Sequence, residues 1–363
     1  LKVTWGRKAR GWGFSNAKGY EQFASVAKDS ALKGIAWETR GDLAAGMSKA
    51  ASVVEGEYRA DYCYHAQMEP LNAVAAVSPA ADAVEVWVGT QSQTITVVAV
   101  AKALGIPVEK VKFNGLLLGG GFGRRGNRDV EFIVDAVLMS KAAGRPVKVM
   151  WTREDDVHNG RFRPLYVNRV RAGLDASGKI VAWHHRVVSD EVLAFMDPVR
   201  HKMTKGRDNI AMRGTELPTY AIPDRLTEGL QQATGMRTNP LRAIGVGQNS
   251  FANEVFIDEL AARQGMDPVA FRLRQLDTTA LAQRARHVIE EAATMADWSR
   301  KRPGRGLGIA YLDHSRPPPA GIAGVPAARQ RGANQRPRFR WPVHLRGAGA
   351  PAATSPAGIC SRS

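Results

Sequence analysis

The chain has 363 residues, of which 44% are hydrophobic, and a formal net charge of +17 at pH 7. This composition is that of an ordinary globular protein with room for two or three domains. No apolar run approaches the roughly 20 residues that cross a bilayer. The two cysteines, Cys63 and Cys360, are too few for a four-thiolate metal site. Because the chain starts at Leu1 without a signal peptide, we expect an internal piece of a longer product without a transmembrane segment, in cytoplasm or periplasm.

The positive charge is concentrated at the C-terminal end. After Asp313 there are eight arginines and no acidic residue, so this tail carries +8 of the +17. The remaining +9 is the charge of a moderately basic enzyme, and we expect no nucleic acid among the partners. Residues 314–363 are rich in Ala, Pro, Arg and Gly and lack apolar periodicity. We predict that this tail is disordered, or is read out of frame.

The first half of the chain is predicted to contain helices followed by strands. Residues 20–54 are predicted to be largely helical, with one helix at 41–53, and residues 55–112 to be mostly strand. Alternation predicts a strand at Val84–Val88, and three- and four-residue spacing predicts a helix at Gln93–Leu104. Further predicted elements are a strand at 111–118, a helix at 130–143 capped by Asp129 and ended by Gly144, a strand at 147–151, a hairpin over 169–186 with its turn at 176–179, and helices at 251–260 and 268–276.

A glycine-rich loop lies between two of these elements. Residues 116–129 have the sequence LLLGGGFGRRGNRD, in which Gly121–Gly126 match G-x-G-x-x-G. A strand before this pattern and a helix after it are typical of a dinucleotide-binding loop. However, the loop follows about a hundred residues of mixed structure and has more glycine than that turn requires. A nicotinamide-dependent dehydrogenase and a purely structural glycine turn both stay open on the pattern alone.

The same loop also resembles a segment of the molybdenum hydroxylases, the xanthine dehydrogenase/aldehyde oxidase family. Gly119–Arg125, with the sequence GGGFGRR, is similar to their glycine–phenylalanine loop, and its Arg-Arg ending to the isoquinoline 1-oxidoreductase β-subunit branch. Four more blocks agree in order and spacing: His65–Asn72, Thr90–Gln93, residues 151–164, and Arg242–Asn249 followed by Phe256–Ala261. Together the five blocks cover about residues 40–313.

The resemblance implies an α+β fold of mixed α/β molybdopterin-binding domains, followed by the disordered tail. It divides the chain into a partial N-terminal segment (1–40), a first molybdopterin-binding region (41–313) and the tail (314–363). It implies a molybdenum cofactor in the molybdopterin cytosine dinucleotide form, whose metal takes no ligand from the protein. The residues that it assigns to cofactor binding are Gln91, Gly120, Gly121, Phe122, Gly123, Arg124, Arg125, Arg242 and Gln248.

The activity implied is oxidative hydroxylation of an N-heterocycle or aldehyde, with water as the oxygen source and a small [2Fe–2S] subunit as electron acceptor. The family's general base is a glutamate in a Gly-Glu-x-Gly segment, and no such segment occurs after Gly308. We therefore assign no catalytic residue and expect the chain to be inactive alone. The alternatives are a non-catalytic truncated product and a basic nucleic-acid-binding module.

Three other groups of polar residues invite a catalytic or metal role, and a structural role is favoured for each. Pro70 disfavours a helix that would align His65 with Glu69. The acidic residues at 154–156 are expected at a solvated strand end or helix cap. His184 and His185 alternate faces of a predicted strand and do not share one metal easily.

Overall fold

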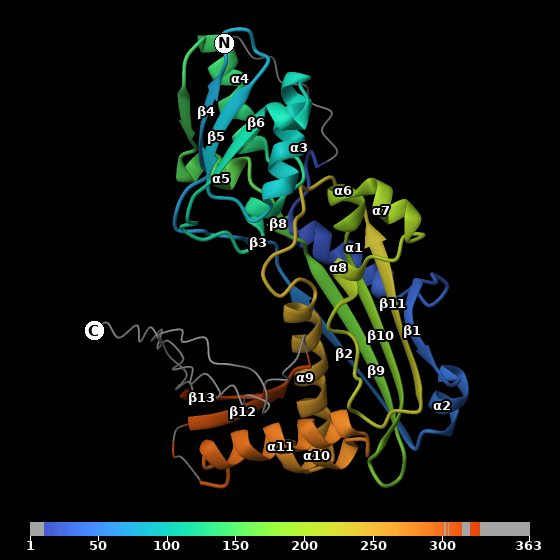
Figure 1. The fold of residues 1–363 in the computed structure, drawn as a ribbon. Helices are drawn as coiled ribbons and strands as arrows, with labels where there is room; N and C mark the ends of the chain where they lie inside the picture. Colours follow the sequence, from blue (N-terminus) through green and yellow to red (C-terminus); the bar gives the residue numbers. More distant parts are fainter. Residues whose placement is uncertain (1–10, 301–302, 304, 314–319, 327–363) are drawn as a thin grey trace. The chain divides into compact units, whose positions relative to one another are not determined.

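The computed structural model describes residues 11–300, 303, 305–313 and 320–326. The chain forms two compact units. Unit 1 contains the residues up to Glu216 together with Ile222–Phe256, and unit 2 contains Leu217–Ala221 and the residues from Ile257 onward. Helices and strands are mixed throughout the described chain (Figure 1), as predicted.

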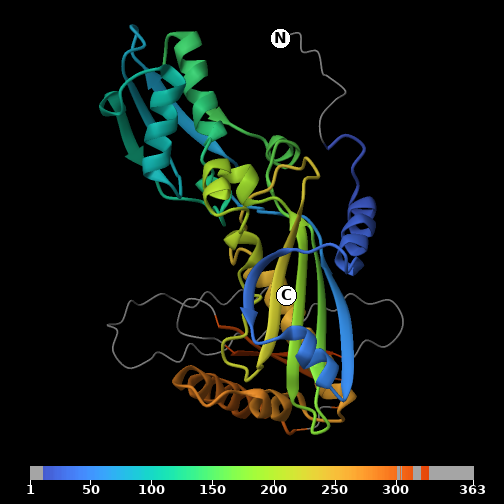
Figure 2. The ribbon, with the colours of Figure 1, turned by 90° about the vertical axis from the view of Figure 1, so that its right-hand side faces the viewer.

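A five-stranded sheet forms one part of unit 1. Its order is β1 (Ile35–Arg40), β11 (Asp224–Gln232), β10 (Ile180–Asp190), β9 (Tyr166–Leu174) and β2 (Ser52–Ala60). Strands β10 and β11 are parallel, and the other neighbours are antiparallel. Helix α1 (Asn16–Lys28) packs on β9 and β10 (Figure 2), where Phe23 and Ala27 contact the buried core, and α2 (Leu43–Lys49) packs on β10 and β11.

A four-stranded sheet forms the other part of unit 1 and leads into the glycine loop. Its order is β6 (Val111–Gly115), β5 (Val84–Val88), β4 (Asn72–Val77) and β7 (Val147–Met150). Strands β5 and β6 are parallel because α3 (Gln93–Leu104) and the short turn η1 (Val108–Lys110) cross between them. Helix α4 (Glu131–Ala143) packs on β4 with an apolar face.

Short elements complete unit 1, and helices dominate unit 2. None of the helices within the described ranges is long and apolar enough to span a membrane. Helix α9 (Val246–Arg263) runs from unit 1 into unit 2. The remaining elements are β3 (Cys63–Tyr64) paired with β8 (Phe162–Arg163), η2 (Arg124–Gly126), α5 (Arg153–His158), α6 (Leu193–Met196), α7 (Pro198–Met203), α8 (Asn209–Met212), α10 (Pro268–Gln275), α11 (Ala280–Met295), and β12 (Arg305–Tyr311) paired with β13 (Ala320–Pro326).

Most elements with a clear apolar period are confirmed, including α3, α4, β5, β7, the β9–β10 hairpin, α9 and α10. The helical prediction for residues 20–54 is partly wrong, because Ile35–Arg40 pairs with β11. The helix predicted at 41–53 ends at Lys49, since Ser52 already pairs with Leu174. The predicted tail lies outside the described residues except for 320–326, which form β13. The boundaries at 40 and 313 stay predictions.

Candidate functional site

The glycine loop, residues 119–123, leads from β6 into the short turn η2 and not directly into a helix. Helix α4 begins only at Glu131, so its N-terminus does not follow the glycines as in a dinucleotide-binding loop. The loop has positive φ at Gly120 (100°), Phe122 (53°) and Gly123 (111°). This conformation destabilises Phe122 by an amount of order 1–3 kcal/mol, so contacts with the surrounding residues must stabilise it.

Neighbouring groups approach the loop so closely that a Cβ would overlap them at three of its glycines. A Cβ at Gly119 would overlap Cβ of Glu69, and a Cβ at Gly123 would overlap the carbonyl oxygen of Pro240, so glycine is needed at both positions. A Cβ at Gly121 would overlap Oε1 of Gln91 and would displace that amide. By contrast, a Cβ at Gly126 would lie 3.7 Å from its nearest neighbour, which is ordinary contact.

Several carbonyl groups of the loop accept hydrogen bonds from the protein, whereas three of its N–H groups have no acceptor among the described residues. Gly121 O accepts from the Arg124 N–H at 2.9 Å, and Phe122 O accepts from the Arg242 N–H at 2.8 Å. Since C=O and N–H of a trans peptide point in opposite directions, the Phe122 N–H points away from Arg124. Within the described part of the chain, no acceptor is found for the N–H groups of Gly120, Gly121 and Phe122.

Gln91 and Arg242 flank these donors. The Gln91 Oε1 accepts from the Gly123 N–H at 2.9 Å, and the Gln91 N–H donates to Arg125 O at 3.2 Å. The exposed Arg242 places its guanidinium carbon 5.2 Å from the centre of the Phe122 ring. A cation thus lies over the Phe122 ring, in a loop with three N–H donors that have no acceptor in the described part of the chain, and this combination favours an anionic or oxygen-rich ligand.

Arg124 anchors the end of the loop from inside the protein. Its side chain is fully buried, and its guanidinium lies 2.8 Å from Oε1 of Glu131 and 3.6 Å from Oδ1 of Asp156. The guanidinium also lies over the Trp151 ring, 5.7 Å from its centre. A planar cation between two carboxylates and an aromatic face is held in one orientation.

Arg125 is also fully buried but points to a different set of partners. It donates to the carbonyl oxygens of Gly89, Glu69 and Pro70 at 3.0–3.1 Å and to Oε2 of Glu69 at 2.9 Å. Its guanidinium lies 5.8 Å from the centre of the Phe132 ring. Both arginines of the Arg-Arg pair thus hold the loop in place, and neither side chain is exposed to solvent.

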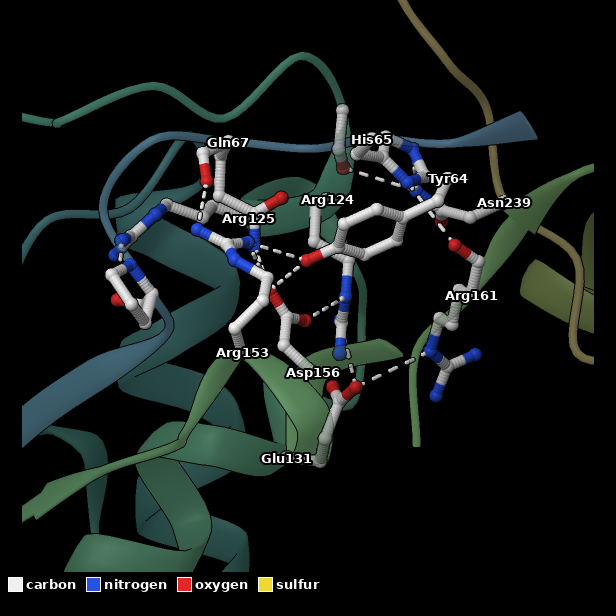
Figure 3. A network of polar contacts seen from close by, with 12 residues as sticks. Tyr64, His65, Gln67, Arg124, Arg125, Glu131, Arg153, Asp156, Arg161 and Asn239 are labelled. Atoms are coloured by element: carbon white, nitrogen blue, oxygen red, sulfur yellow. Dashed lines mark hydrogen bonds and ion pairs between the residues drawn. The ribbon is translucent and has the colours of Figure 1, made fainter. Parts of the chain in front are cut away.

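Asp156 is the centre of the network around Arg124 (Figure 3). Its Oδ2 accepts from the Tyr64 hydroxyl at 2.5 Å and from Nε2 of Gln67, and it lies 3.4 Å from Arg153. Burial and the Asp156 carboxylate raise the pKa of Tyr64 to about 12, so the phenol stays protonated and donates. Arg153 also donates to the Gln67 carbonyl oxygen at 2.6 Å. Asp156 therefore fixes the segment 64–69, which we call the strap.

His65 connects the strap to the segment that carries Arg242. Its Nδ1 lies 3.1 Å from the Arg161 carbonyl oxygen, and its Nε2 lies 3.0 Å from that of Pro240. Burial lowers the pKa of His65, which favours the neutral ring. Asn239 lies beside the ring and donates from Nδ2 to Gly123 O at 3.1 Å. Strap, glycine loop and residues 239–242 thus form one hydrogen-bonded assembly.

The structure brings together most of the residues that the sequence assigned to the site. Seven residues, Gln91, Gly120, Gly121, Phe122, Gly123, Arg124 and Arg125, lie in or against the loop, and Arg242 reaches it through its backbone and side chain. Gln248 is buried on α9 beside the Tyr166 hydroxyl in the five-stranded sheet. No hydrogen bond between Gln248 and the loop occurs within the described residues.

One expectation near the site is wrong, and a second holds only in part. Asp129 does not cap α4, because it is ion-paired with Arg161 and Val130 occupies the cap position with φ 39°. The acidic residues at 154–156 do not share one role. Asp155 forms a capping box with Thr152, as expected for a helix cap, whereas Asp156 is fully buried in the network.

Sequence reasoning missed the supporting residues Gln67, Glu131, Arg153, Asp156 and Asn239. Three of them stand in blocks of the family resemblance, Gln67 in His65–Asn72 and Arg153 and Asp156 in residues 151–164. The signal was therefore present, but the contacts of Asp156 with Arg124 and Gln67 join residues 32 and 89 positions apart. Only the fold brings them together.

Solved structures share this architecture. Quinoline 2-oxidoreductase from Pseudomonas putida 86 superposes with a TM-score of 0.64 at 21% identity, over 78% of this chain and 39% of that one. Aldehyde oxidoreductase from Desulfovibrio gigas superposes with a TM-score of 0.61 at 20% identity, over 77% and 31%. The fold is therefore that of the molybdopterin-binding domains in this class of oxidoreductase.

Sequence comparison defines the family. Residues 26–276 match the molybdopterin cofactor-binding domain. Isoquinoline 1-oxidoreductase subunit beta from Brevundimonas diminuta is 36% identical over 265 residues, 71% of this chain and 33% of that protein. The molybdenum-binding subunit of an aldehyde oxidoreductase from Escherichia coli O157:H7 is 33% identical over 71% of this chain and 34% of that protein. The chain belongs to the molybdopterin cofactor-binding domain family of the molybdenum hydroxylases, and it spans about a third of the length of these relatives.

Proposed function

We propose that this chain forms part of the molybdopterin site of a molybdenum-dependent hydroxylase and that residues 119–123 contact the cofactor through their backbone. The observation that carries the proposal is the set of neighbouring N–H groups at Gly120, Gly121 and Phe122 without an acceptor among the described residues. Donors of this kind suit an oxygen-rich group. When bound, the cofactor supplies the redox chemistry.

The residues around the loop each bind a different part of such a group. The Phe122 N–H donates to an oxygen of the group, and Gly121 permits its close approach. Gln91 uses Oε1 to hold the Gly123 N–H, which leaves its Nε2 to donate to a ligand. Arg242 supplies the positive charge that an anionic or phosphate portion of the ligand requires.

Arg124 and Arg125 contribute to the site by holding the loop in its conformation. Their side chains have no exposure to solvent, so we propose that they shape the loop and do not bind the pyrophosphate of the dinucleotide cofactor directly. The assignment of Gln248 to the cofactor stays a prediction. So does the cytosine dinucleotide form of the cofactor.

For the whole protein we propose oxidative hydroxylation of an aldehyde or an N-heterocycle, with electrons passing to a small [2Fe–2S] subunit. The names of relatives that act on isoquinoline and on aldehydes support these two substrate classes. The family's base glutamate has no counterpart after Gly308 in this chain. We therefore propose that the chain is inactive when expressed alone.

Metal and nucleotide analysis tests this function. The complete protein containing this chain is purified from a host that makes the cofactor, and its molybdenum is measured by mass spectrometry. Acid hydrolysis then releases the nucleotide for chromatography. We expect stoichiometric molybdenum and cytidine monophosphate. A protein that lacks molybdenum but binds a nicotinamide dinucleotide would instead support the dehydrogenase.

A further inference from the structure

Asp156 lies on α5, outside the glycine loop, yet it contacts groups on both sides of it. Its carboxylate is fully buried. Oδ1 faces Nε of Arg124 at 3.6 Å, whereas Oδ2 accepts from Tyr64 and Gln67 of the strap (Figure 3). One carboxylate therefore joins the strap to the end of the loop.

Arg124 transmits the position of this carboxylate to the loop backbone. Its guanidinium is fixed between Asp156 and Glu131, and its own N–H donates to Gly121 O at 2.9 Å. The Gly121–Phe122 peptide is thereby oriented, and with it the Phe122 N–H. A displaced Arg124 side chain would release this peptide.

The strap holds the start of the loop as well. The Glu69 N–H donates to Gly119 O, and Oε2 of Glu69 accepts from the Gly119 N–H, both at 2.9 Å. Asp156 holds the other end of the strap through Tyr64. Both ends of the glycine loop therefore depend on elements that Asp156 orders.

We propose that Asp156 is a positioning residue: it fixes Arg124 and the strap, and through them the conformation in which the N–H groups of residues 120–122 have no acceptor among the described residues. Its significance for the cofactor rests on the proposed function above. Its effect on the loop does not, because the contacts are within the protein. Loss of the Asp156 charge would leave the buried Arg124 with Glu131 as its ion-pair partner, and it would weaken the acceptor of Tyr64 and Gln67, so we expect the loop to respond to its loss.

Hydrogen exchange tests the proposal on the complete protein without cofactor. Four amides of the loop and the adjoining turn η2, those of Gly119, Gly123, Arg124 and Gly126, are hydrogen-bonded within the protein. Their exchange rates report how well this segment is ordered. In Asp156→Asn we expect these amides to exchange at least about 10-fold faster. The matched control is Asp155→Asn, the preceding residue on the same helix, whose carboxylate accepts from the Thr152 N–H and hydroxyl and has no contact with Arg124 among the described residues. Equal exchange in the two variants would overturn the proposal.

A second set of variants separates positioning from a general loss of folding. Tyr64→Phe removes the hydroxyl that contacts Asp156 and Arg153 and should accelerate loop exchange by about 3-fold, while the amides of the five-stranded sheet exchange as in the wild type. If Asp156→Asn does not fold, Tyr64→Phe decides alone, and unchanged loop exchange in it contradicts the proposal. Arg124→Gln should accelerate loop exchange less in the Asp156→Asn background than in the wild type, because the two residues act through one network. An equal effect of Arg124→Gln in both backgrounds would also contradict the proposal.

The holoprotein supplies the readout that links the proposal to the cofactor. In Asp156→Asn we expect altered electron paramagnetic resonance of the reduced metal and at least about 10-fold less bound molybdenum, while Asp155→Asn matches the wild type. If the wild type itself binds no molybdenum, the proposed function fails, while the exchange result still decides the role of Asp156. A wild-type signal in Asp156→Asn would overturn the positioning role.

Discussion

Backbone strain is concentrated at the residues that meet at the candidate site. Phe122, Ala243 and Ile244 all have positive φ, and they lie on the two segments joined by the hydrogen bond from Arg242 to Phe122. Each such residue costs of order 1–3 kcal/mol, which the surrounding contacts must offset. Strain that persists at one place in this way is typical of positions where the backbone itself binds a ligand.

Gly121→Ala tests whether close approach of the backbone matters. Its Cβ would overlap Oε1 of Gln91 and displace the amide that holds the Gly123 N–H. We expect at least about 10-fold less molybdenum bound to the complete protein, since positioning groups of this kind carry such effects. Gly126→Ala is the matched control in the same loop, because its Cβ meets nothing closer than 3.7 Å. Equal metal contents in both variants would contradict the close-approach argument.

The anchoring of the loop by Glu69 depends on pH, because Glu69 must be ionised. Burial opposes its ionisation, but hydrogen bonds from Asn72 and Gly119 and the charge of Arg125 together lower the pKa of Glu69. A lowered pKa in the folded state stabilises the protein above the unfolded value of about 4.3, and this stabilisation is lost as pH falls further. Because the side chain is 35% exposed, we expect less than about 1 kcal/mol.

The measurement compares thermal midpoints of the wild type and Glu69→Gln. The wild type should be the more stable protein at pH 6, and the difference should shrink below about pH 4.3. A difference that stays constant down to pH 3 would show that ionised Glu69 does not anchor the loop.

At the scale of elements, the β9–β10 hairpin contains a second titrating group, in the core. Burial lowers the pKa of His185 to about 3, and its Nε2 lies 2.8 Å from Oδ1 of Asn168 on β9. A histidine whose pKa is lowered in the folded state makes its full contribution to protein stability above its unfolded-state pKa of about 6.5. This contribution is lost as the pH falls toward 3.

We expect the unfolding free energy of the wild type to fall by up to about 1.4 kcal/mol per pH unit below pH 6.5 from this group. In His185→Gln, whose amide can still donate to Asn168, that component is absent. Denaturant unfolding between pH 6.5 and 4.5 measures it, above the range in which Glu69 acts. The same slope in both proteins would contradict the assignment.

Elements with a strong local pattern could be predicted from the sequence, and elements decided by pairing could not. Helix α3 has the predicted bounds because Gly105 ends its apolar period with a left-handed cap. Strand β1 was missed, since Ile35–Arg40 has no alternating pattern and is defined by its pairing with β11. The loop residues were found by resemblance, whereas Asp156 required the fold to bring α5 beside Arg124.

At the scale of the whole molecule, the proposed function makes this chain one part of a larger cofactor site. It spans about a third of the relatives that it matches, and the residues that hold the loop all belong to unit 1. The proposed function assigns no general base to this chain, so it predicts that the chain, expressed alone, shows less than about 1% of the turnover of the complete protein. Assays with an aldehyde and an N-heterocycle would measure this, and comparable turnover would show that the chain supplies its own base.

The most direct test of the central claim is an experimental structure of the complete protein with its cofactor. We predict an oxygen atom of the cofactor within about 2.7–3.2 Å of the Phe122 nitrogen, with the Gln91 amide beside it. The claim would be contradicted by a bound cofactor that leaves the N–H groups of Gly120, Gly121 and Phe122 without a contact.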